Sequence, residues 1–341
     1  MSTNKNNSKQ PILEIKGLKK HFELSSGWFS KEQKSVKAVD GIDLEVYPGE
    51  TLGIVGESGC GKSTTGNTIL RLLEATEGQI LFEGQDLASL SKKEMREKRK
   101  DIQMIFQDPF SSLNPRMKVF DIIAEPLRSH KVATGDDLRK RVYELMETVG
   151  ISKSFDQRFP HEFSGGQRQR IGIARALALK PKLIVCDEPV SALDVSIQSQ
   201  VLNLLSKLQK EFNLTYIFIA HGLPAIKHIS DRVAVMYLGK VVELADKEQL
   251  FSRPMHPYTE GLLSSVPVPD PHVRDTKERI ILTGDLPSPA DPPSGCRFHT
   301  RCPYADELCK TKEPDLVEER DGHHVMCHYP LKEGRGVLIE N

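Results

Sequence analysis

The sequence feature that most constrains this chain is the segment GESGCGKST at residues 56–64. It matches the pattern G-x-x-x-x-G-K-[ST], in which glycines let successive backbone N–H groups converge on phosphate oxygens. An apolar segment at residues 51–55 precedes it, and residues 64–73 follow with helical spacing. A strand, a glycine-rich loop and a helix in this order form the context that a true phosphate-binding loop requires. The segment therefore predicts an α/β fold that binds a nucleotide.

Each residue of this segment, which we call the phosphate loop, is a candidate nucleotide contact. The Lys62 amine would reach the β- and γ-phosphates, and the Ser63 hydroxyl would ligate Mg2+. The N-terminus of the following helix would add its partial positive charge. The candidate contacts are Gly56, Glu57, Ser58, Gly59, Cys60, Gly61, Lys62, Ser63 and Thr64.

Composition narrows the class of protein. The 341 residues carry 47 basic and 47 acidic side chains, and this balance gives no indication of a nucleic-acid partner. No apolar run approaches the roughly 18 residues of a membrane span, and the polar first residues lack the apolar core of a signal peptide. We therefore expect a soluble cytoplasmic chain whose six cysteines do not form structural disulfides.

The expected secondary structure alternates strands and helices up to about residue 250. After about residue 251 the composition changes, prolines gather at positions 267, 269 and 271, and four of the six cysteines follow. We therefore expect an ATP-binding domain at residues 1–250, with a helical subdomain at about 108–180, and a small loop-rich module at 251–341. The expected strands are 12–15, 18–22, 36–39, 42–46, 51–55, 79–84, 102–106, 182–188, 215–220, 232–237 and 240–244, and the expected helices are 64–73, 92–100, 171–178 and 195–212, with a mainly helical segment at 119–149.

Two carboxylates end the apolar strand expected at residues 182–188. Asp187 would complete the Mg2+ site, and the adjacent Glu188 would act as the general base that polarises the attacking water. Ser164, Gly165, Gly166 and Gln167 form a second small, N–H-rich turn before a helix, which is suited to another anion contact.

The whole set resembles the ATP-binding subunit of ABC transporters over roughly residues 12–250. The resemblance implies that Gln107 is the glutamine of the Q-loop and a Mg2+ contact, and that Asp194 lies in the D-loop. It implies that His221 is the switch histidine, and that residues 164–167 are the signature that serves the nucleotide of a partner subunit. It also places Phe22 under the adenine ring. The predicted catalytic residues are Lys62, Gln107, Glu188 and His221, and the predicted Mg2+ contacts are Ser63, Gln107 and Asp187.

More narrowly, the residues of these motifs are similar to those of the F-type ATPase subunit of oligopeptide and dipeptide importers. The stretch Ser112-Leu113-Asn114-Pro115-Arg116 and the stretch His256-Pro257-Tyr258-Thr259 carry this likeness. The family implies a complex with a second, different ATPase subunit, two permeases and an extracytoplasmic peptide-binding protein, at the cytoplasmic face of the membrane.

One residue departs from the family pattern. His221 is followed by Gly222 where family members usually have an aspartate, which puts the orientation of the switch histidine in doubt. Two alternatives to a transport ATPase stay open: a soluble ABC ATPase without a permease, and a regulatory switch that does not hydrolyse ATP. Soluble ABC ATPases without a permease tend to have a coiled-coil insertion or two tandem cassettes, whereas this chain has one cassette and no heptad repeat. The intact Glu188 argues against the regulatory switch.

The C-terminal cysteines Cys296, Cys302, Cys309 and Cys327 have the spacing C-x5-C-x6-C-x17-C. A short, weakly hydrophobic segment with four thiols favours a metal that stabilises it. Zinc sites usually have closer pairs, so we expect a [4Fe–4S] cluster in preference to zinc, with buried free thiols as the remaining possibility.

Overall fold

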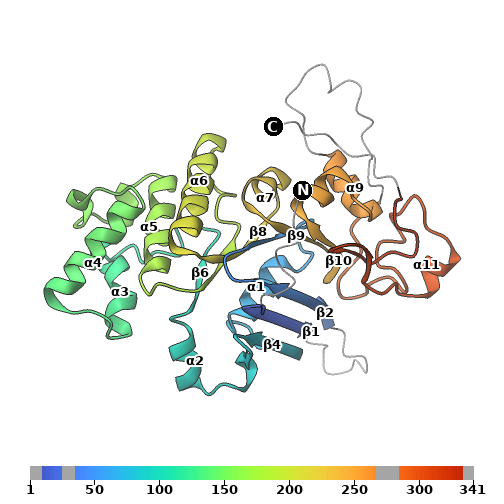
Figure 1. Cartoon of the computed structure of the whole chain (residues 1–341), viewed down its shortest axis with the longest axis horizontal. Helices are drawn as coiled ribbons and strands as arrows, with labels where there is room; N and C mark the ends of the chain where they lie inside the picture. The colour runs from blue at the N-terminus through green and yellow to red at the C-terminus, as the bar shows by residue number, and fades with distance from the viewer. Residues whose placement is uncertain (1–9, 25–34, 109, 266–283, 333–341) are drawn as a thin grey trace. The chain divides into compact units, whose positions relative to one another are not determined.

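A computed structural model describes residues 10–24, 35–108, 110–265 and 284–332 (Figure 1). The proline-rich residues 266–271 and Pro109 lie outside this part of the chain. The chain forms two compact units that interleave along the sequence. The first unit comprises Met1–Ile12, Val46–Thr51 and Ser89–Ala220, and the second comprises Leu13–Glu45, Leu52–Ala88 and His221–Asn341.

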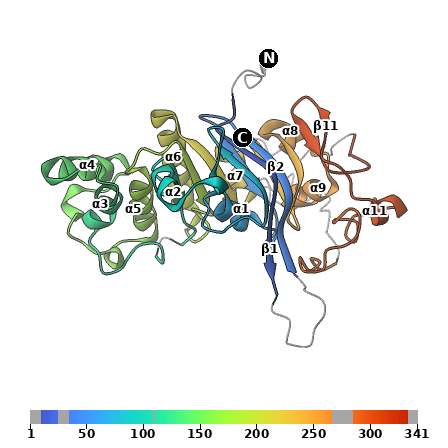
Figure 2. The ribbon, with the colours of Figure 1, turned by 90° about the horizontal axis from the view of Figure 1, so that it is seen from below.

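The first unit is built on three parallel strands. In these, β7 (Leu183–Asp187) lies between β6 (Ile102–Ile105) and β8 (Thr215–Ala220), and every residue of β7 and β8 is buried. Continuous apolar strands of this kind are typical of parallel sheets that are covered on both faces. Figure 2 shows α3, α4 and α5 lying together in this unit. The helices are α2 (Lys92–Lys98), α3 (Val119–Ser129), α4 (Gly135–Thr148), α5 (Gly165–Leu177) and α6 (Val195–Phe212), with short 3-10 turns η2 (Lys153–Phe155) and η3 (Pro160–Glu162).

The second unit contains an antiparallel sheet near the start of the chain. Its strand order is β2-β1-β4-β5, formed by β1 (Leu13–Glu23), β2 (Ser35–Val46), β4 (Glu77–Phe82) and β5 (Gln85–Asp86), and η1 (Leu87–Ser89) follows it (Figure 1). The helix α1 (Lys62–Ile69) begins at the end of the phosphate loop.

Five further strands of this unit lie side by side in the order β11-β12-β10-β9-β3. Here β3 (Thr51–Val55) pairs in parallel with β9 (Arg232–Tyr237), and β9 forms a hairpin with β10 (Lys240–Asp246). The C-terminal residues extend this sheet, because β12 (His323–Val325) pairs with β10 and with β11 (Val317–Arg320). The helices of this part are α7 (Leu223–Ile229), α8 (Lys247–Ser252), α9 (Pro257–Ser264) and α11 (Glu307–Thr311).

The pairing of β12 with β10 depends on a buried carboxylate. Glu243 of β10 is fully buried and accepts hydrogen bonds from the backbone N–H groups of Met255 and His256, at 2.7 and 3.1 Å. The ring of His323 on β12 lies 2.7 Å from the same carboxylate. Three partners from beyond residue 250 thus satisfy one acid of the cassette, which is what a buried charge requires.

Most expected elements match the structure, and α6 and β8 match it at both ends. The strands expected at 12–15 and 18–22 form one strand, β1, and those expected at 36–39 and 42–46 form one strand, β2. The expected helices differ because local turns and caps are decided by single residues. The helix expected at 64–73 starts at Lys62 and ends at Ile69, and the helix expected at 171–178 starts six residues earlier, at Gly165. The helical segment expected at 119–149 is divided into α3 and α4, with Lys131 in the left-handed conformation between them.

Candidate functional site

The phosphate loop lies in the second unit, between the buried strand β3 and the helix α1. Gly61 has φ +106°, and a Cβ atom at this position would lie 2.0 Å from the backbone oxygen of Ala38. Gly59 has φ +79°, but a Cβ atom there would meet no atom within 4 Å. The loop therefore needs glycine at Gly61 for both conformation and space, and at Gly59 for conformation alone.

The Lys62 side chain lies inside this loop and is 3% exposed. Its amine donates hydrogen bonds to the backbone oxygens of Gly56 and Glu57, at 2.8 and 2.9 Å. It also lies 3.3 Å from Nδ1 of His221, which accepts from the ammonium group. The structure thus brings two of the predicted catalytic residues, Lys62 and His221, into contact. His221 immediately precedes α7, whose N-cap residue is Gly222.

Glu57 of the phosphate loop is held by two residues that the sequence did not indicate as partners. Its backbone N–H donates to the hydroxyl of Tyr258, at 2.9 Å, and its carboxylate accepts two hydrogen bonds from Arg301, at 2.7 and 3.1 Å. Carboxylate and guanidinium pair in the two-point geometry that gives the strongest ion pairs. No local pattern signals this pairing, because Glu57 and Arg301 are 244 residues apart.

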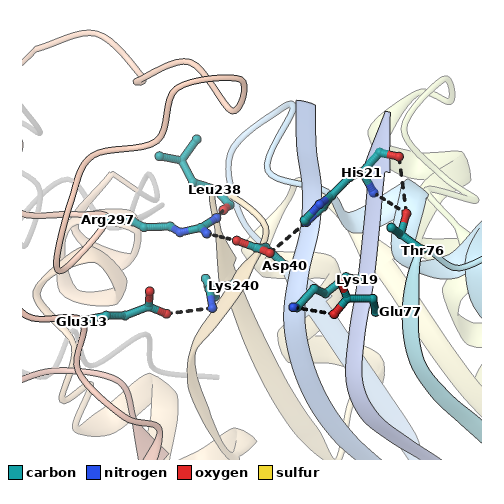
Figure 3. Close-up of polar contacts among 9 residues, drawn as sticks. All are labelled: Lys19, His21, Asp40, Thr76, Glu77, Leu238, Lys240, Arg297 and Glu313. Carbon is teal, nitrogen blue, oxygen red and sulfur yellow. Dashed lines mark hydrogen bonds and ion pairs between the residues drawn. The ribbon is translucent and has the colours of Figure 1, made fainter. Parts of the chain in front are cut away.

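Phe22 lies near the end of β1 and is 37% exposed, with the Lys20 amine 4.9 Å from the centre of its ring. An exposed aromatic ring suits stacking on a base. The preceding residue, His21, is fixed from two sides: its ring lies 2.8 Å from the Asp40 carboxylate, and its backbone N–H donates to Thr76 at 3.0 Å (Figure 3). The strand end that carries Phe22 is therefore well fixed.

The predicted carboxylates lie in the first unit, at the end of β7. Asp187 and Glu188 are 6% and 4% exposed, and the amide of Gln107 donates to the Glu188 carboxylate at 2.7 Å. Glu188 has φ +47°, a left-handed conformation that is uncommon for this residue type. Its N–H donates to the oxygen of Ile219, and its own oxygen accepts from Ser191. Strained backbone at a buried acid is a frequent mark of a functional site.

The signature residues form the N-terminal cap of α5, also in the first unit. The Ser164 hydroxyl accepts from the N–H of Gln167, and the Gln167 side chain accepts from the N–H of Ser164, which is a complete capping box. A Cβ atom at Gly165 or Gly166 would lie 3.1 or 2.5 Å from side chains of the D-loop region. Asp194 is exposed and is the N-cap residue of α6. The signature turn and the turn that contains Asp194 therefore each lead into the N-terminus of a helix, α5 and α6.

The four C-terminal cysteines are all free thiols in the second unit. Burial raises the pKa of Cys296 to about 11 and that of Cys327 to about 12, and the neighbouring thiols contribute to both shifts. However, no three His, Cys, Asp or Glu side chains within the described ranges are placed to hold a metal ion. The geometry of these residues therefore gives the predicted iron–sulfur or zinc site no support.

The residues present fit a magnesium–nucleotide ligand. The backbone of the phosphate loop lies close to Ala38 at Gly61 and has free space beside Gly59. The side chain of Lys62 is buried within the loop. Ser63 is the second residue of α1, and the sequence pattern of the loop assigns its hydroxyl to Mg2+. A loop of this kind, a strand that ends in two acids and a signature cap define a P-loop ATPase of the ATP-binding-cassette class.

Comparison with known proteins narrows this class. The family model described as "ABC transporter" matches residues 39–191, and that described as "Oligopeptide/dipeptide transporter, C-terminal region" matches residues 242–309. The oligopeptide transport ATP-binding protein AppF of Bacillus subtilis is 57% identical over 322 residues, which is 94% of this chain and 98% of AppF. OppF of Salmonella typhimurium is 56% identical over 319 residues, which is 93% of this chain and 95% of OppF. The chain therefore belongs to the family of oligopeptide transport ATP-binding proteins, as its motifs indicated.

A solved structure agrees with the ATP-binding-cassette class. The ATP-binding cassette MJ0796, determined as a dimer in a post-hydrolysis state with ADP and Pi bound, is 28% identical, with a TM-score of 0.62. The match covers 69% of this chain and 98% of that one. Within the described residues, no helix is both long enough and apolar enough to cross a bilayer.

Proposed function

We propose that this chain is the F-type ATPase subunit of a peptide importer. ATP binds at the phosphate loop, and its hydrolysis drives uptake of oligopeptides or dipeptides. The observation that carries this proposal is the state of the catalytic side chains: Lys62 lies in the hollow of the loop against His221, and Gln107 is bonded to the buried Glu188. The relatives favour neither alternative, the soluble non-transport ATPase or the non-hydrolysing switch.

The residue roles follow from the chemistry of phosphoryl transfer, which needs positioning and charge stabilisation. Lys62 would hold the β- and γ-phosphates. Ser63, Asp187 and Gln107 would ligate Mg2+, whose positive charge would offset that of the phosphates. Glu188 accepts a proton from the attacking water. The Gln107 amide, which donates to Glu188, keeps that carboxylate oriented. His221 orients the γ-phosphate end of the site.

The remaining assignments concern assembly. The signature residues 164–167 and Asp194 serve the nucleotide bound by a second, different ATPase subunit. Two permeases and an extracytoplasmic peptide-binding protein complete the complex, and the chain lies at the cytoplasmic face of the membrane. We divide the chain functionally into a cassette, residues 1–250 with its helical part at about 108–180, and a C-terminal extension, residues 251–341.

The test uses the assembled complex and the variant Glu188→Gln. Loss of the general base should lower ATP turnover about 100- to 10,000-fold while ATP binding is kept. The matched control is Glu248→Gln, the same change on a side chain that is 83% exposed, and it should leave turnover unchanged. Turnover at the wild-type rate in Glu188→Gln would exclude the proposed mechanism.

The iron–sulfur cluster on Cys296, Cys302, Cys309 and Cys327 is a separate proposal that rests only on the number and spacing of these cysteines in one short segment. Iron, acid-labile sulfide and visible absorbance of the anaerobically purified complex test it. Absence of all three would reject the cluster and leave the ATPase mechanism unaffected.

A further inference from the structure

One short segment of the C-terminal extension reaches two different parts of the nucleotide site. Residues 296–302, which we call the arginine segment, form a series of tight turns. In these turns the backbone N–H of His299 donates to the backbone oxygen of Cys296, and that of Arg301 donates to the backbone oxygen of Phe298. Arg297 and Arg301 are both 8% exposed, and Phe298 between them is 1% exposed. Buried arginines are uncommon unless they are paired, so the partners of Arg297 and Arg301 indicate what these side chains do.

Arg301 contacts the phosphate side of the site. Its guanidinium group makes the two-point ion pair with Glu57 and lies 5.9 Å from the centre of the Tyr237 ring. The hydrogen bond and charge of Glu57 raise the pKa of Arg301 above its ordinary value. Glu57 is the second residue of the phosphate loop, and its backbone oxygen accepts from Lys62. Arg301 therefore restrains the peptide unit against which Lys62 is held.

Arg297 is connected, through the side chains of Asp40 and His21, to the strand end where the adenine is expected to bind. It donates to Asp40 on β2 and to the backbone oxygen of Leu238, and Asp40 in turn lies 2.8 Å from the ring of His21 (Figure 3). Burial alone raises the pKa of Asp40, but His21 and Arg297 together hold it below its ordinary value. His21 precedes Phe22, the residue placed under the adenine. A chain of polar contacts thus runs from Arg297 to the strand end that carries Phe22.

Phe298 anchors the segment so that both arginines keep their positions. Its ring packs against Tyr237 and Tyr258, with centroids 5.3 and 5.4 Å away. The Tyr258 hydroxyl accepts the N–H of Glu57, so the same aromatic cluster also supports the phosphate loop from below. Aromatic contacts at these distances are favourable beyond the area that they bury.

We propose that Arg297 and Arg301 are positioning residues for nucleotide binding: Arg301 orients the phosphate loop through Glu57, and Arg297 orients Phe22 through Asp40 and His21. The C-terminal extension thereby sets the affinity of the cassette for ATP. This inference rests on the nucleotide site proposed above, and it adds to that site two residues from outside the cassette.

The experiment compares two ligands of the full-length chain by titration calorimetry, Mg-ATP and Mg-tripolyphosphate, which lacks the nucleoside. Arg301→Gln should weaken binding of both ligands about fivefold, because both need the phosphate loop. Arg297→Gln should weaken ATP about fivefold and leave tripolyphosphate unchanged, because only ATP uses Phe22. Arg301→Lys keeps the charge without the two-point geometry, and an intermediate affinity is expected.

The matched control is Glu313→Gln. Glu313 forms an ion pair of 2.7 Å with Lys240 in the same region but contacts neither Glu57 nor Asp40 in the described contacts (Figure 3). It should leave both affinities unchanged. In a Glu57→Gln background, Arg301→Gln should have no further effect on either ligand.

Three outcomes would overturn the inference. Wild-type affinity in both arginine variants would exclude it, and so would equal weakening of ATP and tripolyphosphate by both, which indicates a general structural role. Additive effects of Glu57→Gln and Arg301→Gln would exclude the route through Glu57. A wild-type chain that binds neither ligand would instead reject the proposed nucleotide site. Thermal melting of each variant identifies any that is unfolded, in which case Arg301→Lys carries the comparison.

Discussion

The phosphate loop and the arginine segment are neighbours in the second unit, but they are built by different means. The loop owes its shape to the backbone: glycines in left-handed conformations and a lysine that donates to carbonyl oxygens six and five residues away. The arginine segment owes its position to side chains that reach partners far along the sequence, such as Asp40, 257 residues from Arg297. A shape made by the backbone can exclude a single added atom, as at Gly61, whereas one made by side chains loses stability by degrees as contacts are removed.

The largest expected effect tests the backbone side of this comparison. Gly61→Ala would add a Cβ atom 2.0 Å from Ala38 O in a left-handed conformation, so we expect ATP affinity to fall at least about 100-fold. Gly59→Ala carries the same conformational cost without a clash and should lower the affinity about tenfold at most. Titration with Mg-ATP measures both. Equal losses would show that conformation alone, without the close approach to Ala38, explains the requirement.

The next effect tests the side-chain region. Phe298→Ala would remove a fully enclosed ring and lower the free energy of unfolding by about 3–5 kcal/mol. Tyr304→Ala, in the same extension but 53% exposed, should change it by less than about 0.5 kcal/mol. Denaturant unfolding of the full-length chain provides the measurement. A small loss for Phe298→Ala would mean that the ion pairs alone position the segment.

A pH effect sharpens the comparison further, because buried side chains titrate and backbone does not. Burial lowers the pKa of His256 to about 4 from an ordinary value of 6.5. The unfolded chain therefore binds this proton near pH 6.5 and the folded chain only near pH 4, so stability falls as the pH drops through this window. The contribution lost by pH 4 is about 3 kcal/mol.

The variant His256→Asn isolates this contribution. His256 caps α9 by accepting the N–H of Tyr258, and asparagine can keep such a cap. The variant should show a smaller loss of unfolding free energy between pH 6.5 and 4 than the wild type. Parallel curves for the two proteins would assign the acid sensitivity to other groups.

The smallest effect extends the backbone rule to a residue that is not glycine. Asn213 ends α6 in the left-handed conformation, with φ +51°. Asn213→Ala should cost about 1 kcal/mol of unfolding free energy, while Asn213→Gly should stay within about 0.5 kcal/mol of the wild type. Loss of equal size in both variants would instead point to the asparagine side chain.

The same division explains what could be predicted from the sequence. The phosphate loop, the strand that ends in Asp187 and Glu188, and the helix α6 were predictable, because each depends on residues adjacent in sequence. The role of Gln107 came only from the family resemblance, and its contact with Glu188 was not predicted, since no spacing relates two loops 81 residues apart.

Other features left no local signal. Arg297 and Arg301 stand in a cysteine-containing stretch, and the spacing of Cys296 and Cys302 drew the interpretation toward metal ligands. The early start of α5 at Gly165 was missed because glycines are poor helix formers, and the capping box of Ser164 and Gln167 outweighs their cost.

The carboxylate of Glu243 has a consequence for how the chain can be cut. A protein that ended at residue 250 would keep this acid but lose Met255, His256 and His323. Among the described residues, these three donate the hydrogen bonds to the Glu243 carboxylate given above. A buried carboxylate left without donors is strongly destabilising. The cassette and its extension can thus have separate functions and separate sequence signatures and still depend on each other to fold.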